Sequence, residues 1–174
     1  MNAYRKLWIY IKFSVKLFIK NPGFTTLKTT IRFFPAWKTH LANGKNSVTD
    51  SIPWLTFPSI NFLNKNINKQ MTVFEYGSGG STLFWSERIK QIISVEHDKK
   101  WYEKVKKELE LREIKHVSYF LLEAEEDPDF ALKSSANPND YISDDENFVG
   151  KKYKKKKKKI DEYPDEYFDI ILID

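Results

Sequence analysis

The sequence lacks cysteine entirely and has only three histidines (His40, His97 and His116) among its 174 residues. Without cysteine there can be no disulfide framework, thiolate metal site or cysteine nucleophile. The histidines do not show the spacing of metal ligands, so no metal site is expected. Hydrophobic residues make up 41% and aromatic residues 16% of the chain, which is enough for a packed core. We therefore expect one folded domain with an appendage, in a reducing compartment such as the cytoplasm.

Acidic residues are missing from the beginning of the chain. Residues 1–50 contain nine Lys or Arg and one acid, Asp50, whereas the remainder contains 20 basic and 23 acidic residues. The overall net charge of +5 thus comes from this first segment and from one lysine run. No uniformly basic surface is indicated, and no nucleic-acid partner is expected. We divide the chain into a basic helical segment, 1–50, and an α/β domain, 51–174.

The sequence also lacks an apolar run long enough to span a membrane. Residues 4–20 predict an amphipathic helix, with lysines on one side and an apolar stripe on the other, formed by Leu7, Ile11, Val15 and Phe18. Lys12 and Lys16 interrupt this stretch, which therefore matches a signal peptide poorly and is too short and too charged for a transmembrane helix of about 20 apolar residues. Two interpretations stay open. The helix lies on an anionic membrane at its inner face, or it packs on the protein's own body with solvated lysines.

Prolines divide the segment that follows this helix. Residues 24–50 predict a second short helix and then a loop, with Pro35 as a break. Asp50 or Ser51 is expected to cap the next helix, with Pro53 in its first turn.

From Met71 onward the pattern alternates between strands and helices. Three strands are predicted at 72–76, 91–96 and 117–122, with helices at 81–88 and 99–113 between them. A further apolar strand covers 168–174. This rhythm is typical of a Rossmann-like, doubly wound parallel sheet, here in the order 3-2-1-4.

Residues 125–162 are polar and predict a long surface loop. Within it, residues 151–159 contain eight lysines, whose mutual repulsion favours a disordered or highly solvated segment. The run either attracts phosphate or anionic lipid, or has no specific partner.

The most informative stretch is the turn after the first strand. It reads Glu75-Tyr76-Gly77-Ser78-Gly79-Gly80-Ser81-Thr82, at the strand end where open α/β sheets bind ligands. Gly77 and Gly79 allow a tight turn and close approach of the backbone to a ligand. Glu96 ends the second strand, 19 residues after Gly77, where a carboxylate can accept hydrogen bonds from both ribose hydroxyls. These features predict a nucleoside cofactor.

Two residues discriminate among such cofactors. The dinucleotide fingerprint has a third glycine three positions after the second, where this chain has Thr82. The charge of Glu75, two residues before the first glycine, would repel a pyrophosphate at the helix N-terminus. S-adenosylmethionine (SAM) carries no phosphate, and its amino and sulfonium groups are cationic. We therefore favour SAM, with an NAD-dependent oxidoreductase as the alternative.

The pattern Glu75-x-Gly77-x-Gly79-x-Ser81 resembles the first motif of class I SAM-dependent methyltransferases, with Ser81 replacing the more frequent third glycine. Residues 92–98 resemble the second motif of that family. This resemblance implies that Glu96 holds the ribose and that His97 borders the adenine.

Weaker matches extend the resemblance to residues 53–124 and 167–174. Glu123 resembles an acid near the adenine amino group, and Asp174 resembles the acid that closes the fourth motif and faces the methyl-transfer centre. Asp174 is thus the candidate catalytic residue. The element Pro53–Phe57 resembles an FkbM-like or uncharacterised small-molecule branch of the family.

The resemblance implies a methyltransferase acting on a small-molecule acceptor that cannot be named. Its expected cofactor-binding residues are Glu75, Tyr76, Gly77, Ser78, Gly79, Gly80, Ser81, Thr82, Glu96, His97 and Glu123. Because the family's sheet has seven strands and only four are counted here, we expect a C-terminally incomplete fragment, inactive alone. Its strand at 168–173 would then be an exposed edge prone to self-association. The remaining alternative is a non-catalytic remnant that associates with a membrane surface through its basic helix.

Overall fold

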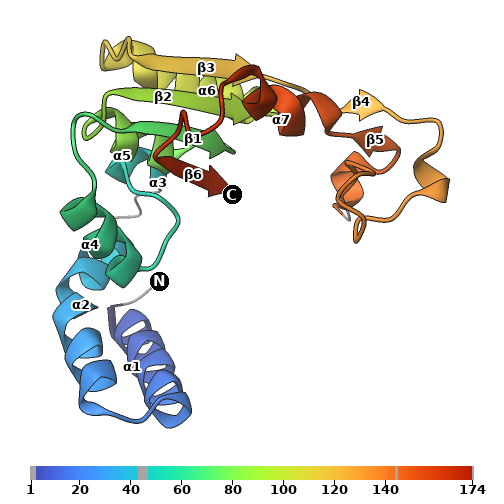
Figure 1. Ribbon diagram of the computed structural model, residues 1–174. Helices are drawn as coiled ribbons and strands as arrows, with labels where there is room; N and C mark the ends of the chain where they lie inside the picture. The colour runs from blue at the N-terminus through green and yellow to red at the C-terminus, as the bar shows by residue number, and fades with distance from the viewer. Residues whose placement is uncertain (1–2, 43–46, 144, 174) are drawn as a thin grey trace.

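A parallel β-sheet forms the centre of the computed structural model, which describes residues 3–42, 47–143 and 145–173 (Figure 1). Across the sheet the strands are β3 (Val117–Leu121), β2 (Gln91–Glu96), β1 (Thr72–Tyr76) and β6 (Ile170–Ile173). All neighbouring strands run parallel, and Glu75 lies opposite Ser94 on one side and Leu172 on the other. The predicted Rossmann-like order is confirmed, with β6 as the fourth strand of this sheet.

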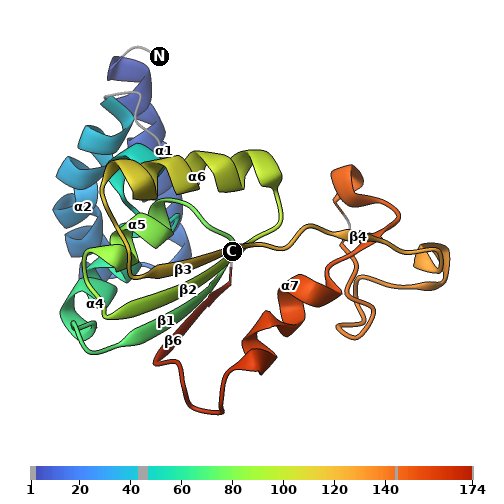
Figure 2. The same cartoon turned by 90° about the horizontal axis from the view of Figure 1, so that it is seen from above.

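Helices cover both faces of the sheet (Figure 2). One face carries α5 (Gly80–Ser86) and α6 (Lys99–Leu111). The other face is covered near the carboxyl ends of the strands by α7 (Lys154–Lys158) and the 3-10 turn η3 (Lys159–Glu162). The layers therefore follow the doubly wound pattern.

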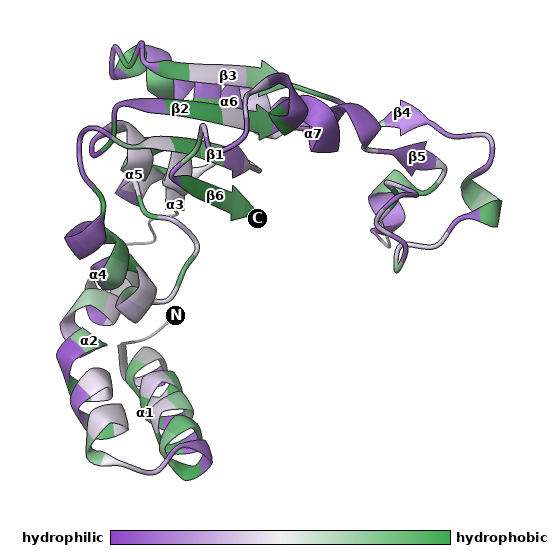
Figure 3. Cartoon of the chain, in the orientation of Figure 1, coloured by the Kyte–Doolittle hydropathy of each residue, from purple (hydrophilic) through white to green (hydrophobic). Residues whose placement is uncertain are grey.

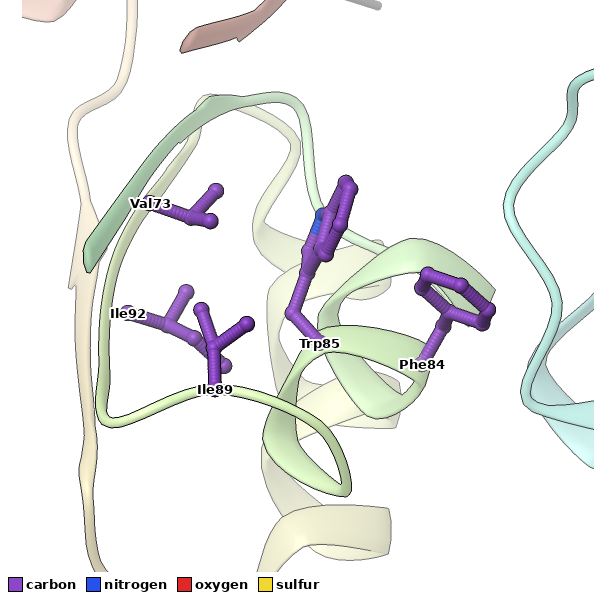
Figure 4. Packing of buried hydrophobic residues seen from close by; sticks show 5 residues of the cluster. All are labelled: Val73, Phe84, Trp85, Ile89 and Ile92. Atoms are coloured by element: carbon purple, nitrogen blue, oxygen red, sulfur yellow. The ribbon is translucent and has the colours of Figure 1, made fainter. Parts of the chain in front are cut away.

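Side chains of β1 alternate between the two faces, as strand geometry requires. Val73 packs with Ile92 of β2, Ile89 and Trp85 of α5, and Phe84 of the same cluster projects from the other side of α5 (Figure 4). On the opposite face Phe74, Ile93 and Val95 form a second buried cluster under Ile160, Tyr163 and Phe168. Glu75 has the same parity as Val73, so its carboxylate is directed toward α5.

The chain before the sheet forms helices, of which the first two stand away from the sheet (Figure 1). Their bounds are α1 (Ala3–Lys20), α2 (Phe24–Ala42), α3 (Ser47–Asp50) and α4 (Phe57–Asn66). Two expectations were wrong here. Pro35 does not break α2, which continues through it. Helix α4 starts after Thr56, whose side chain accepts from the Ser59 amide, and not at residues 50–53.

Helix α3 joins the sheet domain although its residues precede the predicted boundary at residue 50. Val48 is 1% exposed and packs against Leu83 of α5 and Val105 of α6. The compact α/β body thus includes the chain from Ser47 onward.

Helices α1 and α2 form an antiparallel pair, which we call the hairpin. Tyr10 of α1 packs against Phe34 and Trp37 of α2 and donates its hydroxyl hydrogen to the Thr30 carbonyl. The predicted apolar stripe of α1 stays exposed, and Figure 3 shows hydrophobic residues along this helix. Within the described ranges, no helix is sufficiently long and apolar to cross a bilayer.

The lysine run at 151–159, part of the insertion at 125–162, has secondary structure, so of the two expected states the disordered one is wrong and the highly solvated one agrees with the exposure of most lysines in α7. Strand β4 (Glu125–Glu126) pairs antiparallel with β5 (Lys151–Lys152), and two 3-10 turns lie between them, η1 (Phe130–Leu132) and η2 (Glu146–Phe148). Tyr153, the single aromatic residue of the lysine run, is 9% exposed and anchors the start of α7. Most lysines of α7 stay exposed, so solvent weakens the repulsion between their charges. Tyr153 provides the packing.

Candidate cofactor site

Two glycines give the turn between β1 and α5 its shape. Gly77 has a φ of 89°, a left-handed conformation that favours glycine, and its amide donates to the Val95 carbonyl. A Cβ on Gly80 would lie 2.1 Å from the Ser47 carbonyl oxygen and 2.3 Å from that of Ile52. A Cβ on Gly79 would meet only Trp101, at 3.7 Å. Within the chain itself the steric requirement thus falls on Gly77 and Gly80, and close approach of a ligand at Gly79 stays a prediction.

The Glu96 carboxylate joins the turn after β1 to the turn after β2. One oxygen accepts from the Ser78 amide at 2.9 Å and from the Ser78 hydroxyl at 3.0 Å. The other accepts from the amides of His97 and Asp98, at 2.7 and 2.9 Å. The side chain is almost fully buried, with the residue 3% exposed. Glu96 thus fixes the relative position of the two turns that the sequence assigned to the cofactor.

These hydrogen bonds decide the ionisation of Glu96. Burial is the largest single effect and raises the pKa of this carboxyl. The hydrogen bonds from the His97 side chain and from the amides of Asp98, Ser78 and His97 together outweigh burial and lower the pKa from 4.5 to about 2. Glu96 is therefore an anion at neutral pH, able to accept hydrogen bonds only.

Glu75 lies beneath the turn. It is fully buried, and one carboxylate oxygen accepts from the hydroxyls of Thr82 at 2.6 Å and Ser94 at 2.7 Å. The Thr82 hydroxyl oxygen in turn accepts from the Gly79 amide at 3.0 Å. Glu75 thereby supports the turn through Thr82, and direct contact between Glu75 and a cationic ligand stays a prediction.

Two residues that the sequence did not assign to the site, Trp101 and Tyr119, contact the glycine turn. The Trp101 indole donates to the Ser78 carbonyl, and its ring lies against Gly79. The Tyr119 hydroxyl shares a hydrogen bond with the Ser78 hydroxyl. Burial, followed by the charges of Glu96 and Glu75, holds the pKa of Tyr119 well above its usual range, against the effect of the Ser78 hydrogen bond, so this hydroxyl stays neutral. The sequence signal that could have identified Trp101 is its position three residues after Asp98, the residue that caps α6.

A cavity of about 570 Å³ opens at the carboxyl ends of the strands, within the size range of small-molecule sites. Tyr76, at the end of β1, and His97, just after β2, lie on its wall, and Ile173 of β6 borders it. The insertion supplies the opposite wall, with Ile142, Ser143, Asp145, Tyr153, Lys156 and Lys157. Of the predicted cofactor-binding residues, the cavity lining thus includes Tyr76 and His97, which flank the two turns, and not the glycines or Glu96.

The insertion is connected to this wall by polar contacts. The Tyr76 hydroxyl donates to the Lys157 carbonyl at 2.7 Å, and burial followed by the Asp161 charge raises the pKa of Tyr76 to about 12. His97 Nδ1 lies 3.2 Å from a Glu96 oxygen and 3.0 Å from Lys156 Nζ, and this nitrogen either donates to Glu96 or accepts from Lys156. These contacts hold α7 over the strand ends.

The other predicted residues occupy different positions. Gly80, Ser81 and Thr82 are buried in the first turn of α5. Glu123 is exposed after β3, next to Leu122, whose amide donates to the Glu96 carbonyl. Asp174, the candidate catalytic residue, lies outside the described residues. No group of three or more acidic or histidine side chains in the described ranges could hold a metal ion.

Comparisons with known proteins give limited similarity. No protein-family model matches the chain, and no curated protein matches it. A candidate methyltransferase from Streptococcus mutans, solved in complex with SAH (S-adenosylhomocysteine), matches with a TM-score of 0.34 and 23% identity, over 49% of this chain and 44% of its own. A protein-L-isoaspartate O-methyltransferase matches with a TM-score of 0.30 and 26% identity, over 38% of this chain and 24% of its own. The chain thus spans less than half the length of either structure, and its function must be argued from its own site.

Proposed function

We propose that the chain binds SAM at the carboxyl edge of its sheet and forms the cofactor-binding part of a class I SAM-dependent methyltransferase. One observation carries this proposal. The buried Glu96 anion holds the glycine turn after β1 and the turn after β2 together, beside a cavity bordered by Tyr76 and His97. A nucleoside with hydroxyls for Glu96 and a base for His97 fits this arrangement.

The residues present are compatible with such a cofactor. Glu96 offers the ribose hydroxyls a charged acceptor, for which they would compete with the Ser78 hydroxyl. The Ser78 hydroxyl has a second partner in Tyr119, so it can leave Glu96 without losing every hydrogen bond. His97 and Tyr76 offer flat ring surfaces on the cavity wall.

The surroundings of α5 favour a cofactor without phosphate. The backbone carbonyl oxygens of Ser47 and Ile52 lie close to Gly80, where a pyrophosphate would dock on a dinucleotide-binding helix. Carbonyl oxygens carry partial negative charge and would repel a phosphate. The position of the third glycine in the dinucleotide fingerprint is occupied by Thr82, whose hydroxyl donates a hydrogen bond to Glu75. These contacts argue against the NAD-dependent alternative.

Methyl transfer from a sulfonium is an in-line displacement, for which the protein positions the donor and the acceptor. When bound, SAM supplies the methyl group. The chain's own contribution is to orient the nucleoside through Glu96 and to shield the cavity with the insertion. The acceptor and any general base are not assigned to described residues.

Isothermal titration with SAM, SAH and NAD tests the proposal. We expect SAM and SAH to bind and NAD to show no comparable heat. Glu96→Gln should weaken SAH binding at least about tenfold, because a hydrogen bond to a charged group contributes about 1.5–3 kcal/mol. Glu103→Gln, an exposed change on α6, serves as the matched control and should leave affinity unchanged. Tighter binding of NAD than of SAH would refute the proposal.

A further inference from the structure

The hairpin shows an arrangement that the cofactor site does not explain. We propose that it docks on an anionic lipid surface, with the apolar stripe of α1 entering the interface and the basic side chains contacting the headgroups. This inference is independent of the proposed cofactor, because it concerns a different part of the molecule.

The apolar stripe is exposed along the whole length of α1. Leu7 is 41%, Ile11 50%, Val15 52% and Phe18 43% exposed. The stripe of an amphipathic helix in a globular protein is normally its buried side. Here α2 contacts the adjacent side of α1 through Tyr10 instead. Exposed apolar surface of this extent marks an interaction site.

Aromatic and aliphatic side chains extend the exposed surface to the turn of the hairpin. Ile19 is 74% and Phe24 79% exposed, on either side of the turn at residues 21–23. Trp8 is 63% exposed on α1, one residue from Leu7 of the stripe. Tryptophan and phenylalanine are the side chains that interfacial helices place at the level of the headgroups.

The charge of the hairpin identifies the partner. Residues 3–42 contain eight Lys or Arg and no acid. Lys12, Lys16 and Lys20 are exposed on the other side of α1 from the apolar stripe, where they can reach lipid headgroups. Each basic residue near an anionic bilayer contributes about 1 kcal/mol, which is about fivefold in affinity. Apolar insertion combined with this charge is the chemistry of anionic lipid recognition.

The same charge opposes a second copy of the chain as the occupant. Two hairpins that met through their stripes would bring together two surfaces whose described charged residues are all basic, and like charges at short range repel. The lysine run of α7 is a separate basic element, at the opposite end of the molecule from the hairpin turn (Figure 1). The two elements can therefore be tested separately.

Co-sedimentation of the full chain with vesicles provides the test. One vesicle contains phosphatidylcholine alone, and the other contains about one quarter phosphatidylserine, which gives an anionic surface. We expect binding to the second vesicle only, and weaker binding as salt is raised. Equal binding to both vesicles, or none to either, would overturn the proposal.

Four variants locate the binding surface. Ile11→Gln with Val15→Gln should weaken binding at least about tenfold, since both side chains lose their transfer into the interface. Lys12→Gln with Lys16→Gln should weaken it about 25-fold. Leu111→Gln, 69% exposed on α6, and Lys154→Gln with Lys158→Gln, exposed on α7, are the matched controls and should bind as the parent does.

Each remaining outcome has a defined meaning. All substituted side chains are exposed, so circular dichroism should show unchanged helix content. Loss of lipid binding only in the α7 lysine variant would overturn the proposal in favour of the lysine run. A dimer in lipid-free solution that disappears in the Ile11→Gln, Val15→Gln variant would overturn it in favour of a second copy. Sedimentation velocity distinguishes this last case.

Discussion

Helices α1 and α6 have the same kind of sequence and opposite environments. Both alternate basic and apolar residues with helical spacing. In α6 the apolar side is buried against the sheet, with Val105 0% and Leu109 6% exposed. In α1 the corresponding residues, Ile11 and Val15, are about half exposed. Amphipathic spacing therefore identifies a face that needs a partner, and only the tertiary structure shows whether the chain itself provides that partner.

Removal of one apolar side chain from each region should give the largest difference in stability. Phe74→Ala, at a fully buried position of β1, should lower the free energy of unfolding by about 3–5 kcal/mol. Ile11→Ala on the exposed stripe should change it by less than about 0.5 kcal/mol. Urea denaturation measures both values. Similar losses would show that the stripe is buried within the protein in solution.

A pH titration measures how much the Glu96 carboxylate contributes to the stability of the α/β body. Because the folded pKa of Glu96, about 2, is below the ordinary value of 4.5, its stabilisation is complete above pH 4.5 and declines as the pH falls toward 2. The parent should lose about 2 kcal/mol by pH 3 that Glu96→Gln does not lose. Urea unfolding at pH 7 and pH 3 gives this difference. An identical pH dependence in the two proteins would contradict the account of Glu96.

Glycine substitutions compare the close packing of the body with the open hairpin. Gly80→Ala places a Cβ against two backbone carbonyls and should cost about 1–3 kcal/mol. Gly23→Ala, at the hairpin turn, meets nothing within 4 Å and is the control, with an expected change below about 0.5 kcal/mol. The shift of the thermal midpoint checks both. A neutral Gly80→Ala would mean that α3 does not pack on α5 as described.

The smallest effect concerns the sheet edge at β6. Ile171 is 52% and Ile173 77% exposed on one face of this outer strand, so we propose weak self-association through residues 168–173. Ile171→Lys should abolish concentration-dependent association while changing the free energy of unfolding by less than about 0.5 kcal/mol. Sedimentation equilibrium at several loading concentrations measures the association. Association that persists in this variant would place the contact elsewhere.

The strands and their order were predictable because local signals agree there. The apolar runs of β1 and β2 end at a glycine turn and at Asp98, and the observed bounds of both strands equal the predicted ones. The sequence was ambiguous for α4, because Asp50-Ser51-Ile52-Pro53 and Thr56-Phe57-Pro58 both carry a capping residue and a proline. Local rules cannot choose between two equivalent starts.

Long-range contacts explain the remaining differences. The lysine run is ordered because Tyr153 is buried and Lys156 reaches His97, 59 residues away, and neither contact leaves a local pattern. The buried position of Glu75 was accessible from the sequence, since it shares strand parity with the core residue Val73. The requirement on Gly80 depends on the backbone of residues 47–52, which only the folded chain brings near it.

The most direct test of the central claim is a crystal structure of the chain with SAH. We expect density for the nucleoside beside the Gly77–Ser78 turn, with the ribose hydroxyls within hydrogen-bonding distance of the Glu96 carboxylate and the base next to His97. A nucleoside bound elsewhere, or a pyrophosphate-bearing ligand found at this turn in a parallel experiment with NAD, would contradict this claim.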